Sequence, residues 1–189
     1  MIAVNDAYLV APWADICYFA DARWWKWHTD GIAKKWPWVS FTAEEVKKAF
    51  AEFRGQKVTI FNTGMLVADP TVFMLHNHGS DELSEKPNGV HTGSNGGYQA
   101  INIAVLAGGN PILLVAYDMR FQQGKSHSHN GHPLKHSESA YLGYANRFGS
   151  MLPQLKRLKV EVLNCTPGSA IKAFQFVPLE EALCRAPSF

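Results

Sequence analysis

The stretch from His91 to Ala104 constrains this chain more than any other. It reads His-Thr-Gly-Ser-Asn-Gly-Gly-Tyr-Gln-Ala-Ile-Asn-Ile-Ala, a glycine-rich loop with hydroxyl and amide side chains that runs into an apolar segment. The pattern predicts a helix from about Gly97 to Ala107. The first turn of a helix has unpaired backbone N–H groups and the positive end of the helix dipole, which is the geometry of an anion site. A plain strand-to-helix turn would also require glycines and is the alternative.

Short apolar runs alternate with segments of helical periodicity along the whole chain. Thr42 and Glu45 form a capping-box pattern at the start of one expected helix. This alternation predicts an α/β, Rossmann-like three-layer fold with a mostly parallel central sheet, in a single domain over residues 1–189. The expected strands are Met1–Val4, Asp15–Ala20, Lys57–Phe61, Val72–Leu75, Ile112–Ala116, Val160–Leu163 and an edge strand at Phe174–Val177, and the other expected helices are Ala22–Lys35, Thr42–Arg54, Glu138–Lys156 and Leu179–Leu183.

The composition excludes several classes of protein. Hydrophobic residues make up 47% of the chain, which indicates a globular protein. A net charge of +2 is not the strongly basic balance of nucleic-acid binders, so we expect no nucleic-acid partner. No apolar run is long enough to span a bilayer, and the start of the chain lacks a secretory signal pattern. The cysteines Cys17, Cys165 and Cys184 lie far apart, as reduced thiols of a cytoplasmic protein would.

Polar side chains follow most of the expected strands. Because the carboxyl ends of parallel strands meet at one edge of a sheet, we expect these groups to converge there. Their amides and hydroxyls suit a nucleotide, and Asp118 suits a ribose hydroxyl or a bound Mg²⁺. Each residue taken alone has a simpler interpretation as a loop cap. The predicted nucleotide-binding residues are Asn5, Asp6, Thr92, Gly93, Ser94, Asn95, Asp118 and Asn164; Asp21, Asn62, Thr63 and the His76–His78 stretch also belong to this set of strand ends.

Seven of the eight histidines lie between His76 and His136, and we expect residues 119–137 to form a mobile, His-rich loop. His132 lies between Gly131 and Pro133 and is the candidate general base. The alternatives are a solvated loop and a metal site, for which the ligands stay unknown. The polar segment Ser80–Val90 is also expected to be a mobile surface loop. Tryptophans crowd the start of the chain, where they suit packing on the sheet or an interaction surface.

These features resemble a known superfamily over most of the chain. Its anchors are Ala3-Val4-Asn5, the loop Thr92-Gly93-Ser94, the run Ile112–Asp118, the pair Gly131-His132, and Val162-Leu163-Asn164-Cys165. In their order and spacing they are similar to the Rossmann-like superfamily that includes sialyltransferases of the Campylobacter type, the MptE-like (DUF115) proteins and related phage proteins.

The resemblance implies a nucleotide-dependent transferase. In the sialyltransferase version, Asn5 and the loop Thr92–Ser94 would hold a nucleotide-sugar, and His132 would deprotonate a hydroxyl acceptor. In the MptE-like version, the chain would be a pyrophosphokinase that uses ATP and Mg²⁺, with Asp118 near the metal. The resemblance also leads us to expect a nucleotide or nucleotide-sugar as partner, a homo-oligomer, and the bacterial host cytoplasm if the chain is phage-encoded.

One departure from the family pattern affects the expected activity. Members of the superfamily open with an earlier strand and a Gly-Pro-Ser loop that holds donor phosphates. No such loop occurs in this sequence, so we expect the domain to lack the family's first strand. This departure favours a third possibility, a non-catalytic nucleotide-binding protein with a sequestering or regulatory role.

Overall fold

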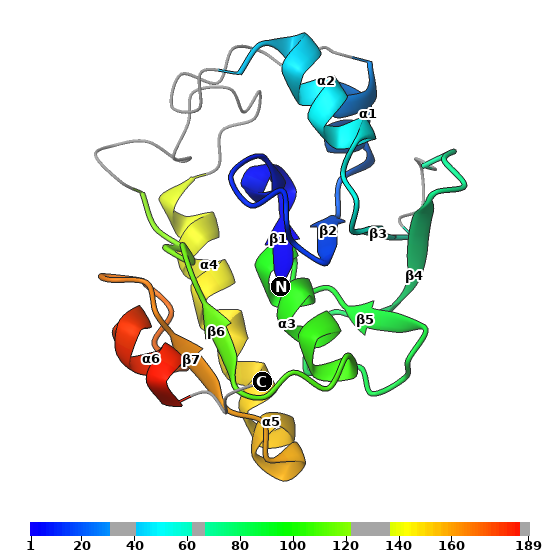
Figure 1. Cartoon of the computed structure of the whole chain (residues 1–189). Coiled ribbons are helices and arrows are strands. Elements are labelled where there is room, and N and C mark those ends of the chain that lie inside the picture. The colour runs from blue at the N-terminus through cyan, green and yellow to red at the C-terminus, as the bar shows by residue number, and fades with distance from the viewer. Residues whose placement is uncertain (31–40, 62–66, 122–136, 186–189) are drawn as a thin grey trace.

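The computed structural model describes residues 1–30, 41–61, 67–121 and 137–185. The first half of the chain forms a five-stranded sheet in the order β1-β2-β3-β4-β5, and all four neighbouring pairs are parallel. Its strands alternate with helices, so the expected α/β class is confirmed and the architecture is consistent with a Rossmann-like fold (Figure 1). The strands are β1 (Ile2–Val4), β2 (Ile16–Phe19), β3 (Gln56–Ile60), β4 (Val72–Gly79) and β5 (Gly89–His91).

A second, three-stranded parallel sheet follows in the order β6-β7-β8. The sequence predicts one central sheet, whereas the described strands fall into two. The second sheet contains β6 (Ile112–Leu114), β7 (Val162–Asn164) and β8 (Gln175–Phe176). The helical segments around it are α4 (Glu138–Arg147), η2 (Phe148–Met151), α5 (Leu152–Leu158) and α6 (Leu179–Arg185).

The five-stranded sheet carries helices on both faces, as expected for three layers. Successive residues of a strand point to opposite faces. Phe19 of β2 packs in one cluster with Trp24 and Phe50, whereas its neighbour Tyr18 packs in another with Ala100. The helical segments of the first face are η1 (Asn5–Leu9), α1 (Ala22–Thr29) and α2 (Ala43–Ala51), and α3 (Gly96–Leu106) covers the second. The capping box predicted for α2 is present, with Thr42 and Glu45 each bonding the other's backbone N–H.

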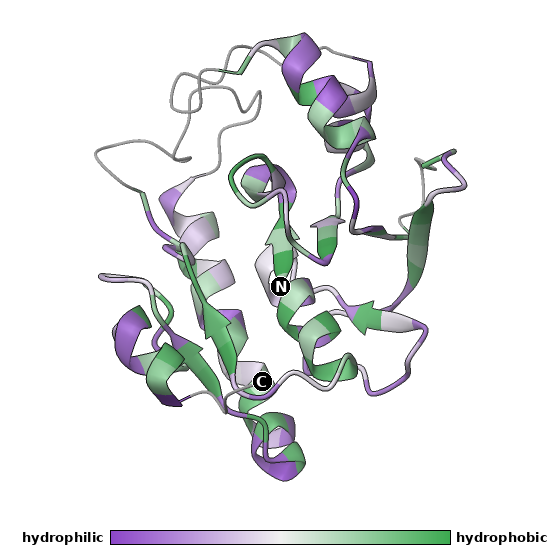
Figure 2. Ribbon diagram, viewed as in Figure 1, coloured by the Kyte–Doolittle hydropathy of each residue, from purple (hydrophilic) through white to green (hydrophobic). Residues whose placement is uncertain are grey.

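Helix α3 connects the two sheets. Ala100 and Ile103 pack on the five-stranded sheet, and Tyr98 and Ile101 pack in one cluster with residues of β6. Every residue from Gly97 to Ile103 is buried. Figure 2 shows hydrophobic and neutral colours along α3 and alternating colours along α1 and α2. An apolar surface all round a helix is typical of a buried one. Within the described residues, no helix is long and apolar enough to cross a membrane.

One sequence interpretation is wrong, and a second misses internal contacts. The His76–His78 stretch does not follow a strand but belongs to β4, because His76 and Asn77 pair with Gly89 and Val90 of β5. The segment Ser80–Val90 lies mostly at the surface, as expected, but it also has buried residues that anchor it. Its Leu83 and Ser84 are only 3% and 4% exposed, and the buried side chain of Asn102 bonds both backbone groups of Ser84.

The other differences concern the extent of elements. The single helix expected over Glu138–Lys156 is divided into α4, η2 and α5. Trp24 is buried, as the packing interpretation of the tryptophans requires, while Trp13 is 73% exposed. Trp36 and Trp38 lie outside the described residues, as do Asn62 and Thr63 and nearly all of the expected loop at residues 119–137.

Candidate functional site

The start of α3 lies between the carboxyl ends of β1 and β6. A Cβ placed on Gly96 would lie 3.3 Å from Cγ1 of Val4 and 3.9 Å from Nδ2 of Asn5. On the other side, the Tyr117 hydroxyl donates to the carbonyl oxygen of Gly97 at 3.3 Å. β1 is an edge strand of the first sheet, and the other strands lie on one side of it in the order β2-β3-β4-β5. After β5 the chain passes through α3 and begins the second sheet at β6. Ligands of open α/β proteins bind at such a change of direction, at the carboxyl ends of the strands.

The glycine loop uses some of its backbone N–H groups internally. Thr92 donates to the Gly79 carbonyl oxygen and Gly93 to that of Ser80, each at 2.8 Å. Tyr98 donates to Oδ1 of Asn95, the cap of α3, at 2.8 Å. In the part of the chain that the structure describes, the N–H groups of Ser94, Gly96 and Gly97 bond no acceptor. We call these three groups the amide trio.

Left-handed backbone is concentrated around the amide trio. Ser94 has φ 60°, and Asn5, directly after β1, has φ 52°. Ala116 and Met119, in the segment after β6, have φ 61° and 46°. These four are among only six described non-glycine residues with positive φ. Such conformations cost about 1 kcal/mol or more each and gather at functional sites, where the surrounding structure enforces them.

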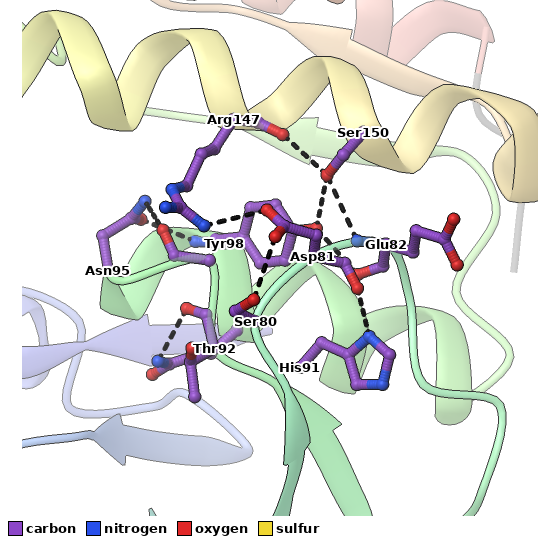
Figure 3. Close-up of polar contacts among 11 residues, drawn as sticks. Ser80, Asp81, Glu82, His91, Thr92, Asn95, Tyr98, Arg147 and Ser150 are labelled. Atoms are coloured by element: carbon purple, nitrogen blue, oxygen red, sulfur yellow. Dashed lines mark hydrogen bonds and ion pairs between the residues drawn. The ribbon is translucent and has the colours of Figure 1, made fainter.

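Tyr98 lies between the glycine loop and the side chains of Arg147 and Ser150, as Figure 3 shows. Its hydroxyl donates to the carbonyl oxygen of Glu82 at 2.7 Å and bonds Oγ of Ser150 at 2.8 Å. Nearby, Arg147 of α4 forms an ion pair with Asp81 at 2.8 Å. Burial raises the pKa of Tyr98, so its hydroxyl stays a proton donor. These contacts tie α4, η2 and the segment before β5 to the loop.

Gln99 holds the loop from the opposite side. The Tyr18 hydroxyl donates to Oε1 of Gln99 at 2.6 Å, and Nε2 of Gln99 donates to the Thr92 carbonyl oxygen at 2.8 Å. Tyr18 and Gln99 are both buried, and burial strongly raises the pKa of Tyr18. A satisfied buried network of this kind fixes one backbone geometry. The backbone of the loop is therefore held by contacts within the chain itself.

The predicted site residues fall into two groups. Asn5, Thr92, Gly93, Ser94 and Asn95 lie together around the start of α3. Asp118 follows Tyr117 at the same junction, and its carbonyl oxygen accepts from the Ala170 N–H at 2.8 Å.

The second group consists of side chains engaged in internal contacts. Asn164 is 2% exposed, and its side chain bonds the backbone of Thr166 and Ile171. The Asp6 carboxylate accepts from Nε1 of Trp24 at 2.6 Å. Asn95 belongs to both groups, because it lies at the start of α3 and its Oδ1 caps that helix. Their roles in ligand binding stay predictions.

The histidines predicted as base or metal ligands are divided between described and undescribed residues. His132 lies outside the described residues, together with His127, His129 and His136. Of the others, His78 bonds Oγ of Ser84 through Nδ1 at 2.7 Å. Desolvation, and then the charges of Lys86, His76 and His91, lower the pKa of His78. Among the residues that the structure describes, no group of three histidine, cysteine or acidic side chains is placed to hold a metal ion.

Sequence reasoning missed the residues that support the loop. The sequence pattern places Tyr98, Gln99 and Asn102 in an apolar helix, and the available signal is that a buried amide inside such a helix must find partners. Their partners Tyr18, Glu82 and Ser150 are between 16 and 81 residues away. Comparison with known proteins adds nothing to this geometry: no family model, no curated protein and no solved structure matches the chain.

Proposed function

We propose that this protein is a nucleotide-dependent transferase that binds the phosphate of a nucleotide, with a nucleotide-sugar as the preferred donor, at the amide trio. The observation that carries the proposal is the set of N–H groups of Ser94, Gly96 and Gly97, which have no partner in the described chain. A phosphate offers several acceptor oxygens, and the start of a helix carries roughly half a positive charge.

The surroundings of the amide trio support a nucleotide over a bare anion. Asn5 is exposed beside Gly96, and its amide can both donate and accept hydrogen bonds, as recognition of a base or ribose requires. Because Gly96 has no side chain, this residue places nothing between the Asn5 amide and the N–H groups of the amide trio. In the proposed reaction, the trio stabilises the charge that develops on the departing phosphate, while a base, His132 in this proposal, removes the proton of the acceptor hydroxyl.

A second candidate function is nucleotide binding without catalysis. It is favoured by the internal contacts of Asp6, Asn95 and Asn164, which leave fewer polar side chains for a reacting substrate. In this version the same amide trio holds the ligand, and the protein sequesters it or reports its presence.

A thermal-shift screen, followed by calorimetry, tests the proposal. The panel consists of CMP, CDP, UDP, ADP, ATP and their sugar derivatives, each with and without Mg²⁺. A bound nucleotide raises the melting temperature by mass action. Binding with donor turnover that His132→Ala abolishes supports the transferase. Tight binding without turnover supports the second candidate instead, and no binding by any member of the panel overturns both.

A further inference from the structure

We propose that His28 and Trp24 are positioning residues, which hold Asn5 in its conformation at the candidate site through the carboxylate of Asp6. This inference rests on the proposed function, because it gives a role to core residues in presenting Asn5 to a nucleotide. None of the three side chains needs to touch the ligand.

The carboxylate of Asp6 is held from two directions. Its Oδ1 accepts from Nε1 of Trp24 at 2.6 Å, and the same oxygen lies 3.2 Å from Nε2 of His28. The Asp6 side chain is 12% exposed and that of His28 is fully buried. Both contacts come from α1, so one helix fixes the position of this carboxylate.

His28 itself has a single orientation. Its Nδ1 lies 2.7 Å from the carbonyl oxygen of Trp24. Because a carbonyl can only accept, Nδ1 donates this hydrogen bond. Nε2 lies toward Asp6, and it donates to the carboxylate when the imidazole carries both hydrogens. The Trp24 and His28 rings stack with centroids 3.7 Å apart, and the edges of Tyr8 and Phe50 enclose the imidazole. The imidazole therefore has no room to rotate away from Asp6.

The connection to Asn5 runs through the backbone. Asn5 and Asp6 are the first two residues of η1, and the chain turns out of β1 at Asn5 with φ 52°. No side chain caps the start of η1. Asparagine adopts the left-handed conformation more readily than most residues, so a contact next to Asn5 needs only to select this conformation over the right-handed and extended ones. The contacts of Asp6 are the side-chain contacts nearest in sequence to this turn.

A purely structural role for the Asp6–His28–Trp24 group makes a different prediction. Removing one member of a buried polar contact commonly destabilises a protein, but a structural role would leave ligand affinity unchanged in the molecules that stay folded. A positioning role changes affinity as well, because the amide of Asn5 then leaves its place beside Gly96.

The experiment compares three variants with the wild-type chain. In His28→Gln the amide nitrogen takes the place of Nε2 and can still donate to Asp6, whereas His28→Leu has no donor. Phe50→Leu is the matched control, since Phe50 packs against His28 in the same cluster without contacting Asp6 through a polar atom. Calorimetry with the nucleotide that binds most tightly, at a temperature where every variant is folded, gives the dissociation constants.

We expect His28→Leu to weaken binding about tenfold, the effect of losing one hydrogen bond at the ligand, and His28→Gln to recover most of it. Phe50→Leu lowers the melting temperature but keeps the affinity. If His28→Leu binds as tightly as the wild type, the inference is overturned. Should His28→Leu not fold, Trp24→Phe removes the indole N–H that bonds Asp6 while keeping an aromatic ring, and it is judged by the same criterion.

A readout without ligand separates this inference from the proposed function. A positive φ gives a strong cross-peak between the amide hydrogen and Hα of the same residue in NMR spectra. We expect that cross-peak of Asn5 in the wild type and in His28→Gln, and its loss in His28→Leu. If no nucleotide binds the wild type, the proposed function fails, and the cross-peak alone then tests whether His28 positions Asn5. An unchanged cross-peak in His28→Leu overturns the inference.

Discussion

Gly93 lies directly against the ring of Tyr98. A Cβ placed on Gly93 would come within 2.0 Å of Cγ of Tyr98, far closer than two carbon atoms can approach. The backbone of the loop thus rests on an aromatic ring whose own hydroxyl is fixed by Glu82 and Ser150. The position of the amide trio is a consequence of this packing.

Gly93→Ala should destabilise the protein by about 3 kcal/mol or more. Its φ of 51° is unfavourable for alanine, and the new methyl group would displace the Tyr98 ring. Urea denaturation measures the change. The control is Gly143→Ala in α4, where nothing lies within 4 Å of the new Cβ; we expect it to add about 0.5–1 kcal/mol of stability. Equal stabilities for the two variants would contradict this account.

Tyr98→Phe should cost about 1–3 kcal/mol, because it leaves the Glu82 carbonyl oxygen without its donor. Ser150→Ala removes the other partner of the same hydroxyl. Since both changes break one network, the double variant should lose less stability than the sum of the two single variants, by at least about 0.5 kcal/mol. Chemical denaturation of all three gives this coupling; strict additivity would mean that the network does not act as a unit.

Asn102→Leu should release the segment between β4 and β5. The Asn102 side chain accepts from the N–H groups of Ser84 and His91 and donates to the Ser84 carbonyl oxygen. Losing these bonds in the core should cost about 3 kcal/mol and leave buried backbone groups unpaired. Compared with the wild type, amide hydrogen exchange in Asn102→Leu should become faster at Ser84 and His91, while exchange at residues of β2 changes less. Unchanged protection of both amides would show that the segment is held by other contacts.

Stability should fall in alkaline solution partly because of Cys17. Burial raises the pKa of the Cys17 thiol to about 12, and the nearby Asp6 adds to the shift. The folded chain therefore keeps a proton that the unfolded chain loses above about pH 8.5, and stability decreases as the pH rises from there toward 12. Urea denaturation at pH 8, 9 and 10 should show a shallower decline for Cys17→Val than for the wild type. Parallel declines would rule out this thiol as a contributor.

The sequence predicts the elements whose local signals are unambiguous. The capping box at Thr42 and Glu45 and the glycine loop before α3 are present as predicted, because both depend on residues that are neighbours in the chain. The sequence pattern predicts that β4 ends at Leu75, whereas the strand continues to Gly79. His76 and Asn77 are polar, but they pair with β5 while their side chains stay exposed, so polarity alone does not end a strand.

The support of the candidate site could not be predicted in the same way. Tyr98 and Gln99 resemble ordinary members of a buried helix, and only the fold shows that they hold Gly93 and Thr92. The partner of Gln99 is Tyr18, 81 residues earlier. Contacts between residues this far apart produce no periodic pattern in a single sequence. The contacts of Asp6 with Trp24 and His28 were also unpredictable, since these partners lie on α1.

The most direct test of the central claim is a charge placed beside the amide trio. Ser94 is exposed, has φ 60°, and makes no side-chain hydrogen bond within the described residues. Asparagine and aspartate both tolerate this backbone, so Ser94→Asn and Ser94→Asp differ mainly by one negative charge. Calorimetry with the tightest-binding nucleotide, at low and high salt, should give an affinity within about twofold of the wild type for Ser94→Asn. Ser94→Asp should bind about tenfold more weakly at low salt, with a smaller difference at high salt. If Ser94→Asp binds the nucleotide as tightly as Ser94→Asn, the phosphate does not lie at the start of α3, and the account is contradicted.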